Sequence, residues 1–246
     1  MGLRCRQVIH ELKARADPAA VQGMGRYGIA TTRTLGGSSV PYLRSLAKRI
    51  GTSHLLAAQL WSSGIHEARI LAAVVDDPAA VTEGQMETGA SDFDSWDVVD
   101  HCCGGLFDRT GAAYRKAVEW SGRNEEYVKR AGFVLMASLA VHDKAAPDRV
   151  LAAFLPLIER EAVGARNYVR KAVNWALRQV GKRSVMLNEM AIESAERILR
   201  QAPASAPWVA SDALRELRGD AVQARLRAHG QRAKALASGG APGVTD

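Results

Sequence analysis

Apolar residues recur every three or four positions along most of this chain, which is the spacing of one face of an α-helix. No segment shows the sustained alternation of apolar and polar residues that is typical of a strand. The pattern predicts about thirteen or fourteen helices joined by short loops. They are expected at Arg4–Ala16, Ala19–Tyr27, Pro41–Ile50, Ser53–Ser62, Ile65–Val75, Ala79–Thr88, Asp92–Asp108, Gly111–Ser121, Asn124–His142, Pro147–Glu161, Ala165–Gly181, Ser184–Gln201, Ser205–Arg218 and Gly219–Leu236.

Turn and cap residues divide these segments. The stretch Gly36–Ser39 is rich in glycine and serine and predicts a loop, after which Pro41 opens a helix. Gly89–Ser91 predicts a second loop, and Ser91 or Asp92 is expected to cap the following helix. The end of the chain, residues 237–246, contains glycine and proline and is predicted to be a disordered tail.

Three of the predicted helices begin in a similar way. Lys129-Arg130-Ala131, Arg170-Lys171-Ala172 and Ser211-Asp212-Ala213 are spaced about 41 residues apart, which is the period of HEAT and armadillo repeats. One helix pair cannot bury its apolar face alone, whereas stacked pairs form a curved solenoid with a concave surface. We therefore predict an all-α, HEAT-like or armadillo-like helical repeat solenoid, built as a single domain over residues 1–236.

The charge of the chain points to a polyanionic partner. Its net charge is +7 and its sequence pI is about 9.6. Proteins this basic commonly bind nucleic acid or an acidic membrane surface, although a general bias towards arginine gives the same charge. No run of 18 apolar residues is present, so no transmembrane helix is predicted. Met1 to Ala16 lacks the apolar core of a signal peptide, and a cytoplasmic protein is expected.

The sequence carries no signature of a metal or cofactor site. Its cysteines are Cys5, Cys102 and Cys103, an odd number without the CxxC spacing of a zinc site. They fit a reducing compartment and are expected to be buried helix residues. The glycine-rich patterns of nucleotide-binding loops and the HExxH zinc motif are also missing. No metal, cofactor or nucleotide is therefore expected.

One acidic and aromatic segment stands out in this basic chain, the run from Asp92 to Asp100. Trp96 and Asp100 are four residues apart, so they share one face of the predicted helix. Two interpretations follow from this spacing. Trp96 either packs in the core while the aspartates favour the positive helix N-terminus, or Trp96 and Asp100 form a functional surface.

Basic residues accompany a second tryptophan. Lys171, Trp175 and Arg178 lie on one face of a predicted helix, an arrangement that suits a phosphate contact beside a stacked sugar or base. A core tryptophan next to a solvated basic stripe fits the same spacing. Lys129 and Arg130 open a comparable helix and are either phosphate contacts or a surface pair. The last helices carry further arginines that either extend a basic track or form a solvated face: Arg215, Arg218, Arg225 and Arg227.

The order of these segments resembles that of a known family. Ser95–Asp100, followed by Lys129-Arg130-Ala131 and then Lys171–Arg178, resembles the AlkD family of DNA alkylation-repair glycosylases. Met24–Tyr27 and Gly37–Lys48 are similar to the family as well, and the likeness covers roughly residues 22–218. At Ser95 the chain departs from the family prototype, which has a tryptophan there.

This resemblance implies a HEAT-like fold whose concave, basic face holds duplex DNA. It also implies excision of cationic N3- and N7-alkylated purines without flipping of the base into a pocket. By the match, Asp100 would be the catalytic carboxylate, and Trp96 and Trp175 would pack on the sugar–phosphate backbone at the lesion. Arg130 would hold that backbone, and Tyr27 would lie near the DNA.

Such chemistry is consistent with the residues present. An alkylated purine leaves as a neutral base, so the enzyme needs chiefly to stabilise an oxocarbenium-like sugar, which a carboxylate does. Lys129, Lys171 and Arg178 are expected to contact phosphates. We expect a monomeric glycosylase acting on duplex DNA that contains alkylated bases. A non-catalytic HEAT-like DNA-binding or scaffold protein, and a self-resistance glycosylase against a bulky DNA-alkylating metabolite, are the alternatives.

Overall fold

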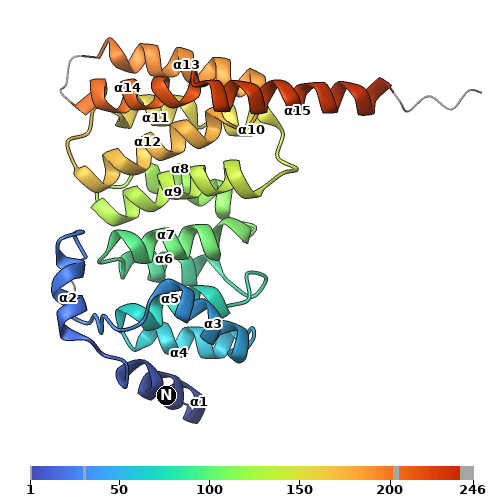
Figure 1. Cartoon of the computed structure of the whole chain (residues 1–246). Helices are drawn as coiled ribbons and strands as arrows, with labels where there is room; N and C mark the ends of the chain where they lie inside the picture. The colour runs from blue at the N-terminus through green and yellow to red at the C-terminus, as the bar shows by residue number, and fades with distance from the viewer. Residues whose placement is uncertain (1, 30–31, 202–204, 239–246) are drawn as a thin grey trace, which may run out of the picture. The chain divides into compact units, whose positions relative to one another are not determined.

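The computed structural model describes residues 2–29, 32–201 and 205–238. Over these residues the chain is all-α and contains no strand, as predicted (Figure 1). One short 3-10 helix, η1, interrupts the series of α-helices. The elements are α1 (Leu3–Lys13), α2 (Pro18–Gly25), α3 (Val40–Ile50), α4 (His54–Ser62), α5 (His66–Val75), α6 (Glu83–Ser91), α7 (Trp96–Gly105), η1 (Phe107–Arg109), α8 (Ala113–Ser121), α9 (Glu126–His142), α10 (Asp148–Ala152), α11 (Leu155–Glu161), α12 (Asn167–Gly181), α13 (Val185–Leu199), α14 (Ser205–Leu217) and α15 (Asp220–Ser238).

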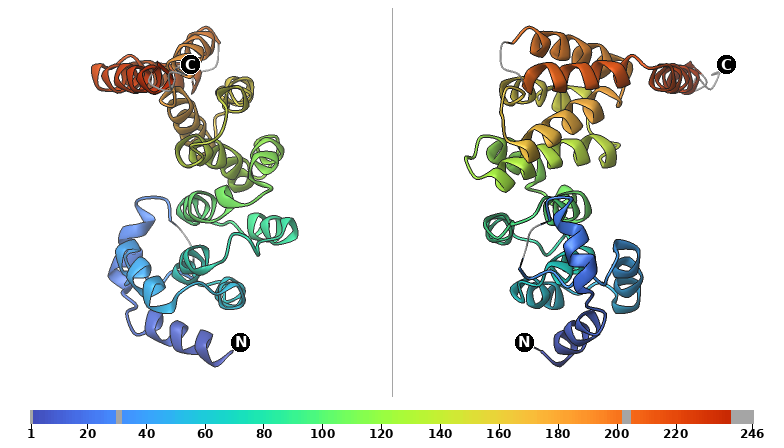
Figure 2. Two further views of the ribbon diagram at one scale, coloured as in Figure 1. Left: turned by 90° about the vertical axis from the view of Figure 1, so that its right-hand side faces the viewer. Right: turned by 60° about the vertical axis from the view of Figure 1, so that its left-hand side comes forward.

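The chain divides into two compact units, an N-terminal unit (Met1–Leu135) and a C-terminal unit (Met136–Asp246). In the N-terminal unit, α5 packs against α3, α4 and α7. In the C-terminal unit, α13 packs against α11, α12 and α14. Figures 1 and 2 show consecutive helices of each unit lying side by side and joined by short loops. Most of these helices bury an apolar face against their neighbours, whereas α2 has no fully buried residue.

The 41-residue period marks the buried side of three helices. Positions that are one period apart in α9, α12 and α14 have no exposed surface, which is the register that a helical repeat requires. The periodicity seen in the sequence therefore reflects packing. Two sets of positions show it, Ala131, Ala172 and Ala213, and then Leu135, Ala176 and Leu217.

Cap residues place several helix starts where the sequence predicts them. The Asp17 carboxylate accepts hydrogen bonds from the backbone N–H groups of Ala19 and Ala20 at the start of α2. Ser53 and Ser184 cap α4 and α13 in the same way. These side chains satisfy backbone donors that the first turn of a helix leaves without partners.

Two predicted boundaries around α6 and α7 are wrong. α6 begins at Glu83 rather than Ala79, because the Thr82 hydroxyl accepts from the backbone N–H of Gln85, and it continues through the predicted loop to Ser91. The following helix is not capped by Ser91 or Asp92. Ser95 precedes it, and Trp96 is its first residue. Trp96 and Asp100 consequently span the first turns of α7.

The segment predicted as one helix over Pro147–Glu161 forms two, α10 and α11. Pro156 lies in the first turn of α11 and has no backbone N–H to continue an earlier helix. Of the predicted disordered tail, residues 237 and 238 end α15, and residues 239–246 lie outside the described part of the chain. No described helix is long and apolar enough to cross a membrane.

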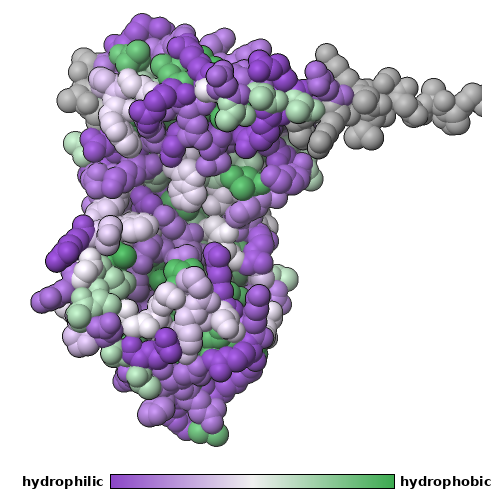
Figure 3. Space-filling view, viewed as in Figure 1, coloured by the Kyte–Doolittle hydropathy of each residue, from purple (hydrophilic) through white to green (hydrophobic). Residues whose placement is uncertain are grey.

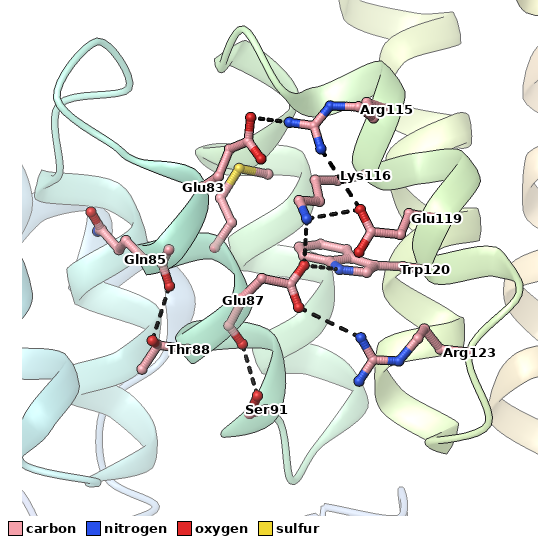
Figure 4. Close-up of polar contacts among 12 residues, drawn as sticks. Glu83, Gln85, Glu87, Thr88, Ser91, Arg115, Lys116, Glu119, Trp120 and Arg123 are labelled. Carbon is pink, nitrogen blue, oxygen red and sulfur yellow. Dashed lines mark hydrogen bonds and ion pairs between the residues drawn. The ribbon is translucent and has the colours of Figure 1, made fainter.

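A buried ion network joins α6 to α8. The Glu87 carboxylate accepts a hydrogen bond of 2.6 Å from the Lys116 ammonium and one of 2.8 Å from the Trp120 indole N–H (Figure 4). Lys116 also donates to Glu119 over 2.8 Å. Because Lys116 is only 4% exposed, these two carboxylates satisfy a charge that would otherwise be costly to bury.

Gly132 allows α9 to pack closely on α8. A Cβ at this position would lie 2.5 Å from the backbone nitrogen of Ser121 and 2.9 Å from the carbonyl oxygen of Ala117. Gly132→Ala is therefore expected to lower the free energy of unfolding by about 1–3 kcal/mol, measured by chemical denaturation. Gly84→Ala is the control, because a Cβ there meets nothing closer than 3.9 Å. Equal stability of the two variants would contradict this account of the α8–α9 contact.

Candidate functional site

A buried polar cluster fixes the start of α7. The Ser95 side chain is fully buried, and its hydroxyl donates a hydrogen bond to the Asp97 carboxylate. The other Asp97 oxygen lies 2.9 Å from Nε2 of the buried His66 of α5. Burial opposes ionisation of Asp97, but the hydrogen bonds from His66 and Ser95 outweigh it and lower the pKa of Asp97. Ser95, where the family prototype has tryptophan, is thus part of the interior.

Asp100 and Arg130 form a two-point ion pair between α7 and α9. Arg130 Nε donates to Asp100 Oδ1 over 3.0 Å, and Arg130 Nη2 donates to Asp100 Oδ2 over 2.8 Å. The Arg130 side chain is 6% exposed, whereas that of Asp100 is 23% exposed. The geometry is the fork-to-fork arrangement that orients a carboxylate most firmly. Asp100 is therefore held in place and still reaches the surface.

Trp96 completes this group. The Arg130 guanidinium carbon lies 5.8 Å from the centre of the Trp96 ring, within the range of a cation–π contact. The Trp96 indole N–H donates to the backbone carbonyl of Tyr27 over 2.9 Å, which ties the segment after α2 to α7. The Tyr27 side chain is 75% exposed. The structure thus brings together Trp96, Asp100, Arg130 and Tyr27, all of which the sequence singles out.

The Asp100 carboxyl lies in a mixed electrostatic environment. Burial raises the pKa of Asp100 above that of an exposed aspartate, and the Arg130 guanidinium opposes this rise. Asp97, three residues before Asp100 in the same helix, adds a smaller repulsion that also raises the pKa of Asp100. Arg130 is thus the partner that favours the ionised form.

Lys129 precedes Arg130 in the sequence and is also buried, with 7% of its surface exposed. The Asp100 carboxylate accepts its hydrogen bonds from Arg130, so the structure groups Arg130 with Asp100. The phosphate contact expected of Lys129 stays a prediction.

The remaining predicted residues lie in the C-terminal unit, on α12. Lys171 is exposed. Arg178 is partly exposed and pairs with Glu216 of α14 over 2.7 Å. Gln179, with its amide oxygen turned towards its donors, accepts from the Trp175 indole N–H over 3.0 Å. Lys171 is thus the more accessible of the two cations.

An aromatic residue that the sequence did not single out lies on α14. Trp208 is 43% exposed, and the Arg170 guanidinium carbon of α12 is 5.1 Å from the centre of its ring. Its neighbours in the sequence are small and apolar, so periodicity alone favours a buried position. The arginines predicted to form a basic track are mostly engaged within the protein: Arg215 with Asp212, Arg218 with Glu196, and Arg225 with the carbonyl of Lys182.

Other features of the N-terminal unit lie apart from this group. An apolar pocket between α4, α5, α6 and α7 is walled by Trp61 and Phe107, and neither Trp96 nor Asp100 lines it. All three cysteines are buried in helices, as predicted. Within the described residues, no three histidine, cysteine or carboxylate side chains gather in a way that could hold a metal ion.

Comparison with known proteins places the chain in a family. A family model described as "DNA alkylation repair enzyme" matches residues 8–217. The chain belongs to this family. The matched residues span both units and include Trp96, Asp100, Arg130 and Trp175. Family membership confirms the resemblance that these residues suggest in the sequence.

The fold of this chain is HEAT-like. A solved structure, described as representing a new family of proteins related to the HEAT-like repeat DNA glycosylases with affinity for branched DNA structures, matches with a TM-score of 0.70. The alignment covers 84% of this chain and 92% of that one, at 19% sequence identity. At this identity the likeness establishes the fold. No curated protein sequence matches the chain.

The ion pair makes a prediction about the titration of Asp100. Arg130→Gln removes the cation that opposes the effect of burial, so the pKa of Asp100 is expected to rise further and its titration midpoint to move to higher pH. The carboxyl carbon signal of Asp100, followed by NMR over pH, measures this midpoint. Arg109→Gln, which removes an exposed arginine of η1, is expected to leave it unchanged. An unchanged or lower midpoint in Arg130→Gln would contradict the assignment.

Proposed function

We propose that this chain is a DNA glycosylase that excises cationic N3- and N7-alkylated purines from duplex DNA. The observation that carries the proposal is the Asp100 carboxylate, oriented by two hydrogen bonds from Arg130 and left partly exposed beside Trp96. A carboxylate that is both fixed and accessible suits the stabilisation of developing positive charge. Membership of the DNA alkylation repair enzyme family supports this reading.

The reaction is hydrolysis of one N-glycosidic bond. The bond between the sugar C1′ and the base nitrogen breaks, its electron pair leaves with the cationic base, and the base departs neutral. A water oxygen bonds to C1′, and its proton passes to a base such as Asp100 or to solvent. No general acid is needed for the leaving group. The barrier lies mainly in the oxocarbenium-like sugar, which the Asp100 carboxylate stabilises electrostatically.

The aromatic and basic residues have supporting roles in this proposal. The electron-rich face of the Trp96 indole favours a sugar whose positive charge grows in the transition state. Arg130 orients Asp100 and favours its ionised form, and its positive charge attracts the DNA backbone near the lesion. Tyr27 and Trp175 contact the sugar–phosphate backbone, and Lys171 and Arg178 bind phosphates.

In the N-terminal unit, Trp96 and Asp100 present a partly exposed face, and neither lines the apolar pocket next to α7. Excision from such a face requires no flipping of the base into a cavity, in contrast to enzymes that enclose their target. It also tolerates bulky adducts. A comparison of small and bulky N3-adenine adducts in an excision assay would distinguish general repair from self-resistance to a DNA-alkylating metabolite.

A second candidate function is non-catalytic recognition of DNA structure. The solved structure with a TM-score of 0.70 is described as having affinity for branched DNA, so this fold is compatible with binding. The presence of Trp96, Asp100 and Arg130 in one group favours the catalytic proposal. The two functions differ in whether any base is released.

The role of Asp100 is tested by a charge-removing substitution. Asp100→Asn keeps the shape of the side chain and removes its charge, so the single-turnover rate of 7-methylguanine release is expected to fall by about 100-fold or more. Affinity for the duplex is expected to stay within about twofold. Asp94→Asn is the matched control, since the Asp94 carboxylate pairs with Arg69 rather than Arg130, and it is expected to retain activity. Full activity of Asp100→Asn would eliminate the proposed mechanism.

The contribution of Lys171 is tested by the salt dependence of binding. Lys171→Gln is expected to reduce the slope of log affinity against log salt by about one, because one fewer counterion is released from the DNA. Lys171→Arg keeps the charge and is expected to keep the slope. Fluorescence anisotropy of labelled duplex DNA over a series of salt concentrations gives both values. An identical slope in Lys171→Gln would show that this side chain does not contact a phosphate.

A further inference from the structure

Trp208 exposes a large aromatic surface on an otherwise well-buried helix. The residues of α14 that face α12 and α13 have no exposed surface, whereas Trp208 is 43% exposed. The visible surface of the C-terminal unit is mostly hydrophilic with small hydrophobic patches (Figure 3). An exposed tryptophan does not contribute its full apolar area to the core. The buried residues of α14 include Ala206, Val209, Ala210, Ala213 and Leu217.

The position of Trp208 is fixed by neighbouring contacts. The side-chain amide of the buried Asn174 donates to the carbonyl of Val209 over 3.1 Å, which sets the register of α14 against α12. Arg170, one turn before Asn174, then lies over the Trp208 ring at 5.1 Å. The Trp208 ring thus packs against Arg170 of α12, and a ring that is already in position lowers the entropic cost of binding a ligand on its exposed surface.

The charge around Trp208 is positive. Arg170 donates to the neutral side chain of Asn167, and within the described residues no carboxylate pairs with Arg170 or with the exposed Lys171. The carboxylates further along α14 are already paired with cations. Asp212 contacts Arg178 and Arg215, and Glu216 contacts Arg178 and Lys182.

We propose that Trp208, Arg170 and Lys171 form a platform for an unpaired nucleotide of DNA. The base stacks on the exposed part of the Trp208 ring. The backbone phosphates next to this nucleotide bind Arg170 and Lys171. An exposed aromatic ring beside cations is the arrangement by which proteins bind single-stranded nucleic acid. Bases inside an intact duplex are stacked on both faces and offer no free face to this ring. This proposal depends on the proposed function only because both take DNA as the partner.

This surface therefore favours DNA in which a single-stranded segment adjoins a duplex. Base stacking on an aromatic residue contributes enough for alanine substitution to weaken binding by about 5- to 100-fold. The phosphate contacts of Arg170 and Lys171 are shared by paired and unpaired DNA. Selectivity for the unpaired segment thus depends on Trp208.

The test compares two DNAs of equal phosphate number, a blunt duplex and a duplex with a thymidine overhang, by fluorescence anisotropy. Trp208→Ala is expected to weaken binding of the overhang DNA by about 5- to 100-fold and to change blunt-duplex binding by less than about twofold. Trp208→Phe is expected to restore most of the difference. Leu199→Ala is the matched control, since Leu199 lies in the same unit and is 44% exposed. It is expected to bind both DNAs as the wild type does.

A second readout distinguishes loss of the Trp208 contact from a folding defect. Oligothymidine is expected to quench part of the tryptophan fluorescence of the wild type, and Trp208→Phe is expected to lose that part while still binding. Equal losses of affinity for the blunt and the overhang DNA in Trp208→Ala, or no loss of affinity for either, would overturn the proposal. Base release from methylated blunt duplex is expected to persist in Trp208→Ala. Its absence in the wild type would refute the glycosylase proposal and leave the platform standing.

Discussion

The geometry of the candidate site depends on the ion pair between Asp100 of α7 and Arg130 of α9. Arg130 is almost fully buried, and Asp100 supplies the carboxylate that pairs with its charge at two points. Two hydrogen bonds fix the direction of the carboxylate before any ligand binds. A catalytic group placed in this way needs little reorganisation during the reaction. The same contact that joins two helices therefore also prepares the proposed chemistry.

The buried cluster at the start of α7 provides the second constraint. His66 and Ser95 hold Asp97 in the interior, which makes Trp96 the first residue of the helix. Trp96 then contacts the Arg130 guanidinium and, through its indole N–H, the carbonyl of Tyr27. A tryptophan in place of Ser95 would have to be accommodated where a small hydroxyl side chain is now buried. The departure from the family prototype is thus linked to the packing of α7 against α5.

Much of the fold follows from local pattern, and the site follows from it only partly. Periodicity and cap residues predict nearly every helix, and the shared face of Trp96 and Asp100 follows from their spacing. Periodicity does not predict the separation of α10 from α11 near Pro156 or the start of α7 at Trp96, because apolar spacing continues across both positions. The pairing of Asp100 with Arg130 joins residues 30 positions apart and depends on how α7 packs against α9. The exposure of Trp208 likewise depends on which face of α14 contacts α12, and its apolar neighbours in the sequence conceal it.

The central claim is that a fixed, accessible carboxylate in this HEAT-like fold cleaves the glycosidic bond of a cationic base. The most direct measurement is the release of free bases from methylated duplex DNA by the wild-type protein, separated and quantified by chromatography. The account predicts release of 3-methyladenine and 7-methylguanine in amounts that rise with time and enzyme, with unmodified purines retained. Tight binding of the same DNA without release of either base would contradict it.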